Sequence, residues 1–151
     1  MHWTPYVVVT AIIERAGRFL MVEEEVDGKL VINQPAGHLE QGETLFEAVK
    51  REVLEETAWH IEPEDLIGLY LYAKPHTDIA YFRVCFRGAP LKHEPDRPLD
   101  NEIARALWLS REEIFAVQNR HRSPMVMRCV DDYLAGKHYP LEVLYHLPFY
   151  P

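Results

Sequence analysis

The sequence predicts a single α+β domain, over residues 1–151, in which helices sandwich a β-sheet. Its length of 151 residues, 48% of them hydrophobic, suits one core and would be cramped for two. Segments rich in β-branched residues interleave with helical patterns, without the regular βαβ alternation of a parallel sheet. The 11 prolines are scattered, so they mark loops and not a linker.

The N-terminal part of the chain reads as short strands separated by turns. Tyr6–Ile13 is rich in β-branched residues and is expected to be a strand. Ala16-Gly17 forms a turn, and Phe19–Val22 is its hairpin partner. Asp27-Gly28 is another strong turn signal, followed by the short apolar stretch Leu30–Ile32.

A helix is expected next. Thr44 and Glu47 form a T-x-x-E capping box, with Thr44 as the N-cap, and the helix should end near Thr57-Ala58. Apolar residues recur at spacings of three and four, which gives one buried stripe. These residues are Leu45, Phe46, Val49, Val53 and Leu54.

The following segment alternates strands with turns. Strands are expected at Leu66–Tyr72, Ala80–Phe86 and Ala106–Leu109. The signals between them predict a turn at Gly88-Ala89-Pro90 and a polar, proline-rich loop at Leu91–Asp100.

Two helices complete the pattern. Ser110 and Glu113 form a second capping box, which opens a short helix. The last helix is expected from about Pro124, because proline suits the first helical turn, to the Ala135-Gly136 stop.

The charge balance is acidic, since 16 Lys and Arg against 24 Asp and Glu give a net charge of −8. Nucleic-acid polymers and anionic membranes are bound through basic patches, so neither is an expected partner. No apolar run approaches the roughly 18 residues of a membrane helix, and no secretory signal is visible. We therefore expect a cytoplasmic protein, with Cys85 and Cys129 as buried, reduced thiols.

The densest chemistry lies at residues 51–56, within the first helix. Glu52 precedes Glu55 and Glu56 by three and four residues, so the three carboxylates project from one face. They offer the hard oxygen ligands that Mg²⁺ or Mn²⁺ prefers. Arg51 can pair with Glu47 or with Glu55, and so fix carboxylate orientation. A solvated acidic helix face is the alternative interpretation.

A glycine-bearing loop, residues 37–43, leads into this helix, whose N-terminal N–H groups favour anions. Loop and helix together resemble the Nudix box, the signature of Nudix hydrolases. The pattern is Gly37, five residues, Glu43, seven residues, and then Arg51 to Glu56. It matches at the leading glycine and at every charged position. So long a pattern is highly specific, and it implies one Nudix-fold domain, an α/β/α sandwich with a mixed sheet.

The sequence departs from the family pattern at one position. The family usually has glycine two residues after the last glutamate, where this chain has Ala58. Alanine in a left-handed conformation costs about 1 kcal/mol, unless the helix ends differently. Segments 33–40, 122–124 and 139–143 are similar to the NudJ-type phosphatases, bacterial Nudix enzymes that act on nucleoside di- and triphosphates and thiamine-type pyrophosphates.

The resemblance implies hydrolysis of a phosphoanhydride bond by water attack at phosphorus, with Mg²⁺ as cofactor or Mn²⁺ in its place. It makes Glu52, Glu55 and Glu56 metal ligands, with the Gly37 carbonyl as a further one. Glu55 or Glu56 would orient the attacking water, and Arg51 would belong to the same catalytic set.

Two further residues are candidates outside the box. Glu102 either lies beside the site and acts on water, or is a solvated loop acid. Arg122 precedes the start of the last helix and is the candidate contact for substrate phosphate.

The expected partner is a small phosphorylated substrate, and the chain is expected to be a monomer or a homodimer. ADP-ribose or another nucleotide sugar is the alternative substrate of an enzyme. A non-catalytic Nudix-fold ligand-binding regulator is the alternative from another class, although a pure binder has no need of three mutually repelling carboxylates. A structural protein with an acidic helix is the third possibility.

Overall fold

The computed structural model describes residues 2–147, and its main sheet is mixed. The strand order is β5-β1-β7-β6. β1 pairs parallel with β7 and antiparallel with β5, and β6 pairs antiparallel with β7. The strands are β1 (Tyr6–Ile12), β5 (Ala36–His38), β6 (Trp59–Ala73) and β7 (Ala80–His93).

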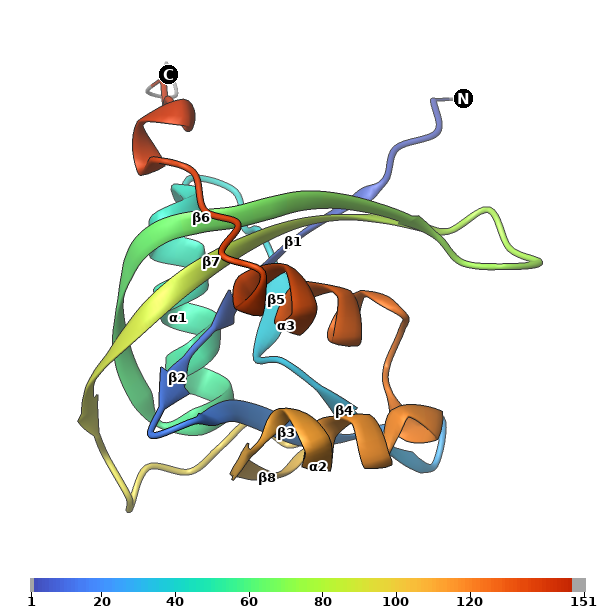
Figure 1. The fold of residues 1–151 in the computed structure, drawn as a ribbon. Helices are drawn as coiled ribbons and strands as arrows, with labels where there is room; N and C mark the ends of the chain where they lie inside the picture. Colours follow the sequence, from blue (N-terminus) through green and yellow to red (C-terminus); the bar gives the residue numbers. More distant parts are fainter. Residues whose placement is uncertain (1, 148–151) are drawn as a thin grey trace.

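A second, antiparallel sheet lies beside the first (Figure 1). Its central strand is β3, which pairs with the other three. The strands are β2 (Glu14–Arg15), β3 (Arg18–Val26), β4 (Lys29–Asn33) and β8 (Ile103–Leu109). The sequence indicated most of these strands but not their separation into a second sheet.

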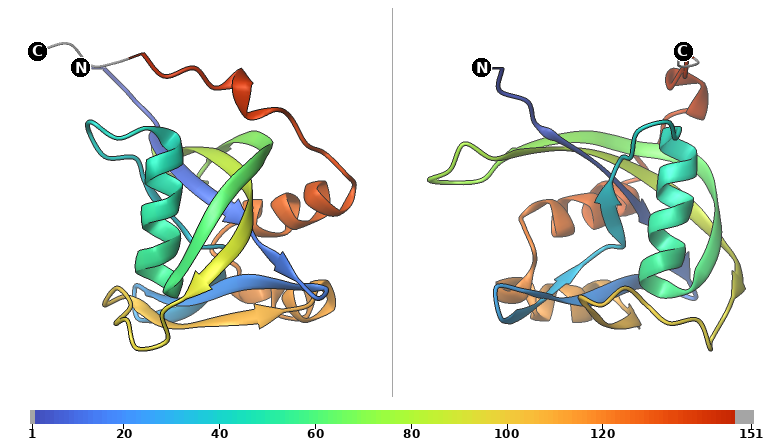
Figure 2. Two further views of the ribbon diagram at one scale, coloured as in Figure 1. Left: turned by 90° about the vertical axis from the view of Figure 1, so that its left-hand side faces the viewer. Right: turned by 180° about the vertical axis from the view of Figure 1, so that it is seen from behind.

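Helices cover both faces of the main sheet, as Figure 2 shows from two further directions. Alternate residues of β7 separate the two cores: Val84 packs with Val49 and Val53 of α1, and Cys85 packs with Cys129 and Val130 of α3. The helical segments are α1 (Leu45–Thr57), α2 (Arg111–Ala116), η1 (Gln118–Arg120), α3 (Met125–Leu134) and η2 (Leu141–Val143). The α+β sandwich expected from the sequence is therefore confirmed.

The predicted helix ends are confirmed in detail. Both capping boxes form: the Thr44 and Ser110 side chains accept backbone hydrogen bonds at α1 and α2. α1 ends at Ala58, which has a φ of 62° in the left-handed region, so alanine does take the conformation that glycine would favour. α3 stops before Gly136, with a φ of 81°. Cys85 and Cys129 are both buried, and neither forms a disulfide.

The β6–β7 hairpin is longer than expected. β6 begins at Trp59 and β7 continues to His93, so the predicted turn at Gly88-Ala89-Pro90 is wrong and the Leu91–Asp100 loop begins later. Gly88 pairs with Pro63, and register shifts around that proline absorb its missing N–H donor. Local turn signals are thus overridden by strand pairing.

The tip of the β6–β7 hairpin extends beyond the rest of the fold (Figure 1). A second correction concerns β5, a strand where the sequence indicated only a loop, because it pairs with β1. No helix among the described residues is long and apolar enough to cross a membrane.

Candidate active site

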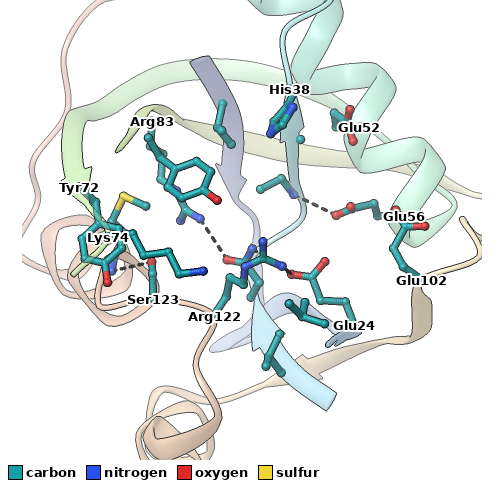
Figure 3. A pocket seen from close by; sticks show the side chains of 18 of the residues that line it. Glu24, His38, Glu52, Glu56, Tyr72, Lys74, Arg83, Glu102, Arg122 and Ser123 are labelled. Atoms are coloured by element: carbon teal, nitrogen blue, oxygen red, sulfur yellow. Dashed lines mark hydrogen bonds and ion pairs between the residues drawn. The ribbon is translucent and has the colours of Figure 1, made fainter. Parts of the chain in front are cut away.

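The first helix and the strand β5 enclose one end of a pocket of about 620 Å³. Glu52 and Glu56 on α1 line it, with residue exposures of only 9% and 4%. Figure 3 shows both carboxylates beside the strand that carries His38. Glu55, on the same helix, is half-buried and lies outside the pocket lining.

Gly37 allows this close approach. It lies in β5, opposite Val9, and a Cβ at position 37 would overlap the Glu52 carboxylate. The neighbouring backbone also holds the second carboxylate, because the Ala36 N–H donates a hydrogen bond to Glu56 Oε1 at 2.9 Å. Glycine is therefore required at position 37 because the Glu52 carboxylate occupies the space of a Cβ, and not because the backbone turns there.

Arg51 ties the carboxylates together. Its Nη1 donates to Glu52 Oε1 at 2.7 Å and to Glu55 Oε2 at 3.3 Å. Its Nε and Nη2 grip the Glu43 carboxylate at 3.0 and 2.7 Å. The predicted pairing with Glu55 is present, but that with Glu47 is not, since the Glu47 side chain caps the helix instead. Arg51 lowers the pKa of Glu43 through these hydrogen bonds.

Asp100 joins the glutamates to form two groups of possible metal ligands. Glu52, Glu55 and Asp100 each offer an oxygen within 4.8 Å of the others. Glu56, Asp100 and Glu102 form the second group by the same measure, so Asp100 belongs to both. The Asp100 N–H donates to the Glu55 carbonyl at 3.0 Å, which anchors the loop to the end of α1.

Sequence reasoning missed Asp100. It stands two residues before the candidate Glu102, but a loop acid carries no periodicity that relates it to a helix far upstream. Only the return of the chain from β7 to β8 brings the two together. Glu102 itself is exposed and lines the pocket, so it lies beside the glutamates.

Burial changes the acidity of these groups. It raises the pKa of Glu56 to about 9, and the neighbouring charges of Glu24 and Glu52 act in the same direction. Burial likewise raises the pKa of Glu52, against the lowering effect of Arg51. Glu56 therefore retains its proton near neutral pH unless a cation takes the proton's place.

These residues fit a divalent cation. The donors are hard carboxylate oxygens, they converge from α1 and the loop before β8, and a glycine leaves room for one of them. Solvated acidic residues would instead stand apart and exposed, whereas Glu52 and Glu56 are buried.

The other end of the pocket is basic and aromatic. Arg122 lines it, and its Nη1 lies 3.5 Å from Glu24 Oε1. Tyr72, Lys74 and Arg83 also line this part. Sequence reasoning weighed Tyr72 as a stacking residue but favoured sheet packing for it, and it did not name Lys74 or Arg83. Figure 3 shows these side chains apart from Glu52 and Glu56.

Comparisons with known proteins agree with the geometry. The family model of the NUDIX domain matches residues 3–129. Phosphatase NudJ of Escherichia coli (strain K12) is 38% identical over 147 residues, which cover 96% of this chain and 95% of that protein.

Solved structures give the same result. A NUDIX hydrolase from Nitrosomonas europaea superposes with a TM-score of 0.93 at 46% identity, covering 95% of this chain and 98% of that one. An ADP-ribose pyrophosphatase from Streptococcus suis has a TM-score of 0.67 at 16% identity, covering 90% and 96%, and shows likeness of fold alone.

Proposed function

This chain belongs to the Nudix hydrolase family, and from that premise we propose that it uses Mg²⁺ to hydrolyse phosphoanhydride bonds of nucleoside di- or triphosphates or of thiamine-pathway pyrophosphates. The observation that carries the proposal is that two sets of three carboxylate residues, which have Asp100 in common, could each hold a metal ion. Mn²⁺ has the same ligand preference and is the alternative ion. We place the enzyme in the cytoplasm, as a monomer or a homodimer.

The residues that would hold the ion are Glu52, Glu55, Glu56 and Asp100, with the Gly37 carbonyl as a further ligand. When bound, Mg²⁺ supplies neutralisation of charge on the phosphate oxygens. The chain does the positioning. Its Arg51 fixes Glu52 and Glu55 by hydrogen bonds of 2.7 and 3.3 Å. Such supporting contacts typically change metal affinity or activity by about 10- to 100-fold.

The attacking water needs an acceptor that orients it in line with the leaving oxygen. The candidates for this acceptor are Glu55, Glu56 and Glu102, which belong to the two groups of possible metal ligands. Glu56 is buried and accepts a hydrogen bond from the Ala36 N–H, whereas Glu102 lines the pocket and is exposed. We assign the orienting role to Glu55 or Glu56 and an accessory role to Glu102.

Substrate binding is assigned to the rest of the pocket. Arg122 faces it and is half-exposed, with a side-chain exposure of 38%. A phosphate group is its natural partner, because guanidinium donors match phosphate oxygens in geometry and charge. The relative named Phosphatase NudJ supports a phosphorylated small molecule as the substrate class.

A panel of nucleotides and pyrophosphates with Mg²⁺, including ADP-ribose, tests the proposal. Products are scored as orthophosphate, pyrophosphate or nucleoside monophosphate. The proposal expects catalytic release of phosphate from nucleoside di- or triphosphates or thiamine pyrophosphates, abolished by EDTA. Turnover confined to ADP-ribose would favour the nucleotide-sugar alternative. No turnover on any member, with ligand binding intact, would favour a regulator.

A further inference from the structure

Four cationic residues line the pocket, and three of them come together at one end from segments far apart in the sequence. Lys74 follows β6, Arg83 lies within β7 and Arg122 precedes α3. In Figure 3 they gather together, on the side of the pocket away from Glu52 and Glu56. The pocket therefore has an acidic end and a basic end.

Arg83 is the most unusual of the three, because its residue exposure is only 2%. Its Nη1 donates to Gln34 Oε1 at 3.0 Å and its Nη2 to Asn33 Oδ1 at 3.1 Å, both neutral amides. No carboxylate within residues 2–147 forms an ion pair with it, and its Nε has no hydrogen-bond partner there. A buried charge normally has a countercharge.

Lys74 and Arg122 do not offset the positive charge of Arg83. Lys74 is exposed and forms no ion pair of 4.0 Å or less within residues 2–147. Arg122 forms an ion pair with Glu24, with 3.5 Å between Nη1 and Oε1. Lys29 and Asp27 also line the pocket, with opposite charges. Apart from that pair, three positive charges at this end face the Glu24 carboxylate, in surroundings where the buried guanidinium of Arg83 is weakly screened.

We propose that this basic end binds a second phosphate group of the substrate, in addition to the pyrophosphate held at the carboxylate end. The proposal rests on the hydrolase function proposed above and names its substrate class: molecules with anionic groups at two separated positions. Lys74 and Arg122 make the direct contacts, and Arg83 supplies a buried positive field beneath them. A neutral sugar or base would leave the charge of Arg83 without a countercharge.

Such a phosphate has two possible sources, a phosphomonoester on the sugar or the far end of a longer phosphoanhydride chain. Calorimetry with AMP and with adenosine 3′,5′-bisphosphate, in the presence of Mg²⁺, tests the first source without turnover. The ratio of kcat/KM for ATP over ADP tests the second. We expect a gain of about fivefold or more from the extra phosphate in at least one arm, as for one or two charge-assisted hydrogen bonds.

The basic end is then altered by Lys74→Met, an exposed position where the fold should be unaffected, and by Arg83→Met. Both should reduce the gain to less than about twofold, which is within the spread of exposed charge effects. Lys92→Met, on β7 but outside the pocket lining, is the matched control and should keep the full gain. If Arg83→Met fails to fold, as thermal melting would reveal, Lys74→Met alone decides.

Equal affinity for AMP and the bisphosphate, together with equal kcat/KM for ADP and ATP, would overturn the inference. A gain that survives in Lys74→Met would overturn it too. The two proposals fail separately. A Lys74-dependent binding gain without hydrolysis of any phosphoanhydride would refute the proposed function and support the basic end as a phosphate site.

Discussion

The two ends of the pocket face opposite electrostatic problems. At the acidic end, Glu52 and Glu56 are buried side by side, and burial raises the pKa of both. At the basic end, Arg83 is buried against two neutral amides, while Lys74 is exposed. The acidic end needs a cation before it can carry its full charge, and the basic end needs an anion.

The ends also differ in how rigidly the chain holds them. Arg51 links Glu43, Glu52 and Glu55 in one network, and the Ala36 N–H holds Glu56. Lys74, by contrast, stands at the base of the projecting hairpin tip without an ion pair among the described residues. Fixed geometry suits chemistry at phosphorus, whereas an exposed charge without an ion pair is available to attract an anionic substrate.

The largest expected effect comes from removing a carboxylate of the acidic end. Glu56→Gln keeps the volume and the acceptor for the Ala36 N–H, so the fold should survive. We expect kcat with Mg²⁺ to fall by more than about 100-fold, because a group that orients the metal or the water is lost. Steady-state phosphate release measures this.

Glu112→Gln on α2 is the control, because that exposed residue is outside the pocket lining. Its activity should match the unaltered chain. Full Mg²⁺-dependent activity in Glu56→Gln would show that the acidic end is not the chemical centre.

A smaller loss is expected from crowding the same end without changing its charge. In Gly37→Ala, the new Cβ would collide with the Glu52 carboxylate and displace it. Misplacement of this kind costs up to about 100-fold in rate, and we expect 10- to 100-fold here. Gly42, in the loop between β5 and α1, has a φ of 86° but open space where a Cβ would lie, so Gly42→Ala separates backbone strain from crowding. Equal activity of the two variants would contradict the role given to Gly37.

The pH dependence of stability should report the acidic end directly. The folded chain keeps a proton on Glu56 up to a pKa of about 9, whereas the ordinary value is 4.5. The stabilisation associated with that proton is therefore complete below pH 4.5 and is lost as the pH rises toward 9. Denaturant unfolding without metal should show this decline, and saturating Mg²⁺ should reduce it.

Glu56→Gln sharpens this prediction, since glutamine does not titrate. The variant should lose the part of the slope that Glu56 causes, and it should gain little from Mg²⁺. An unchanged pH slope in the variant would place the coupled protonation elsewhere.

The smallest effect is expected at Ala58, where the helix of the acidic end stops. Glycine would relieve the left-handed strain of about 1 kcal/mol, but it would also remove a buried methyl group of similar worth. Ala58→Gly should therefore change the free energy of unfolding by less than about 1 kcal/mol and leave kcat within about twofold. Thermal melting and initial rates check both.

The acidic end could be predicted from the sequence because its carboxylates follow one another at helical spacing. A helix alone is enough to place Glu52, Glu55 and Glu56 on one face. The capping box at Thr44 indicated where that helix starts. Gly37 lies next to them because a short loop connects it to the same helix. Asp100 could not be placed, since its position depends on the path of a loop after a distant hairpin.

Most of the basic end could not be predicted from the sequence, for the same reason. Lys74 directly follows β6 and Arg83 lies within β7, and only the register of β6 on β7 brings these two positions near each other. Arg83 was not a candidate, because no sequence pattern shows that Asn33 and Gln34 will accept its hydrogen bonds in a buried position. The predicted turn at Gly88 failed likewise, because pairing with β6 outweighs local turn propensity.

The division of labour between the two ends is best tested by measuring kcat and KM separately for Glu56→Gln and Lys74→Met, with Mg²⁺ and one preferred substrate. We predict that Glu56→Gln lowers kcat by more than about 100-fold with little change in KM, whereas Lys74→Met raises KM about fivefold with kcat nearly unchanged. A loss of kcat in Lys74→Met as large as that in Glu56→Gln, or a change in KM alone in Glu56→Gln, would contradict this account.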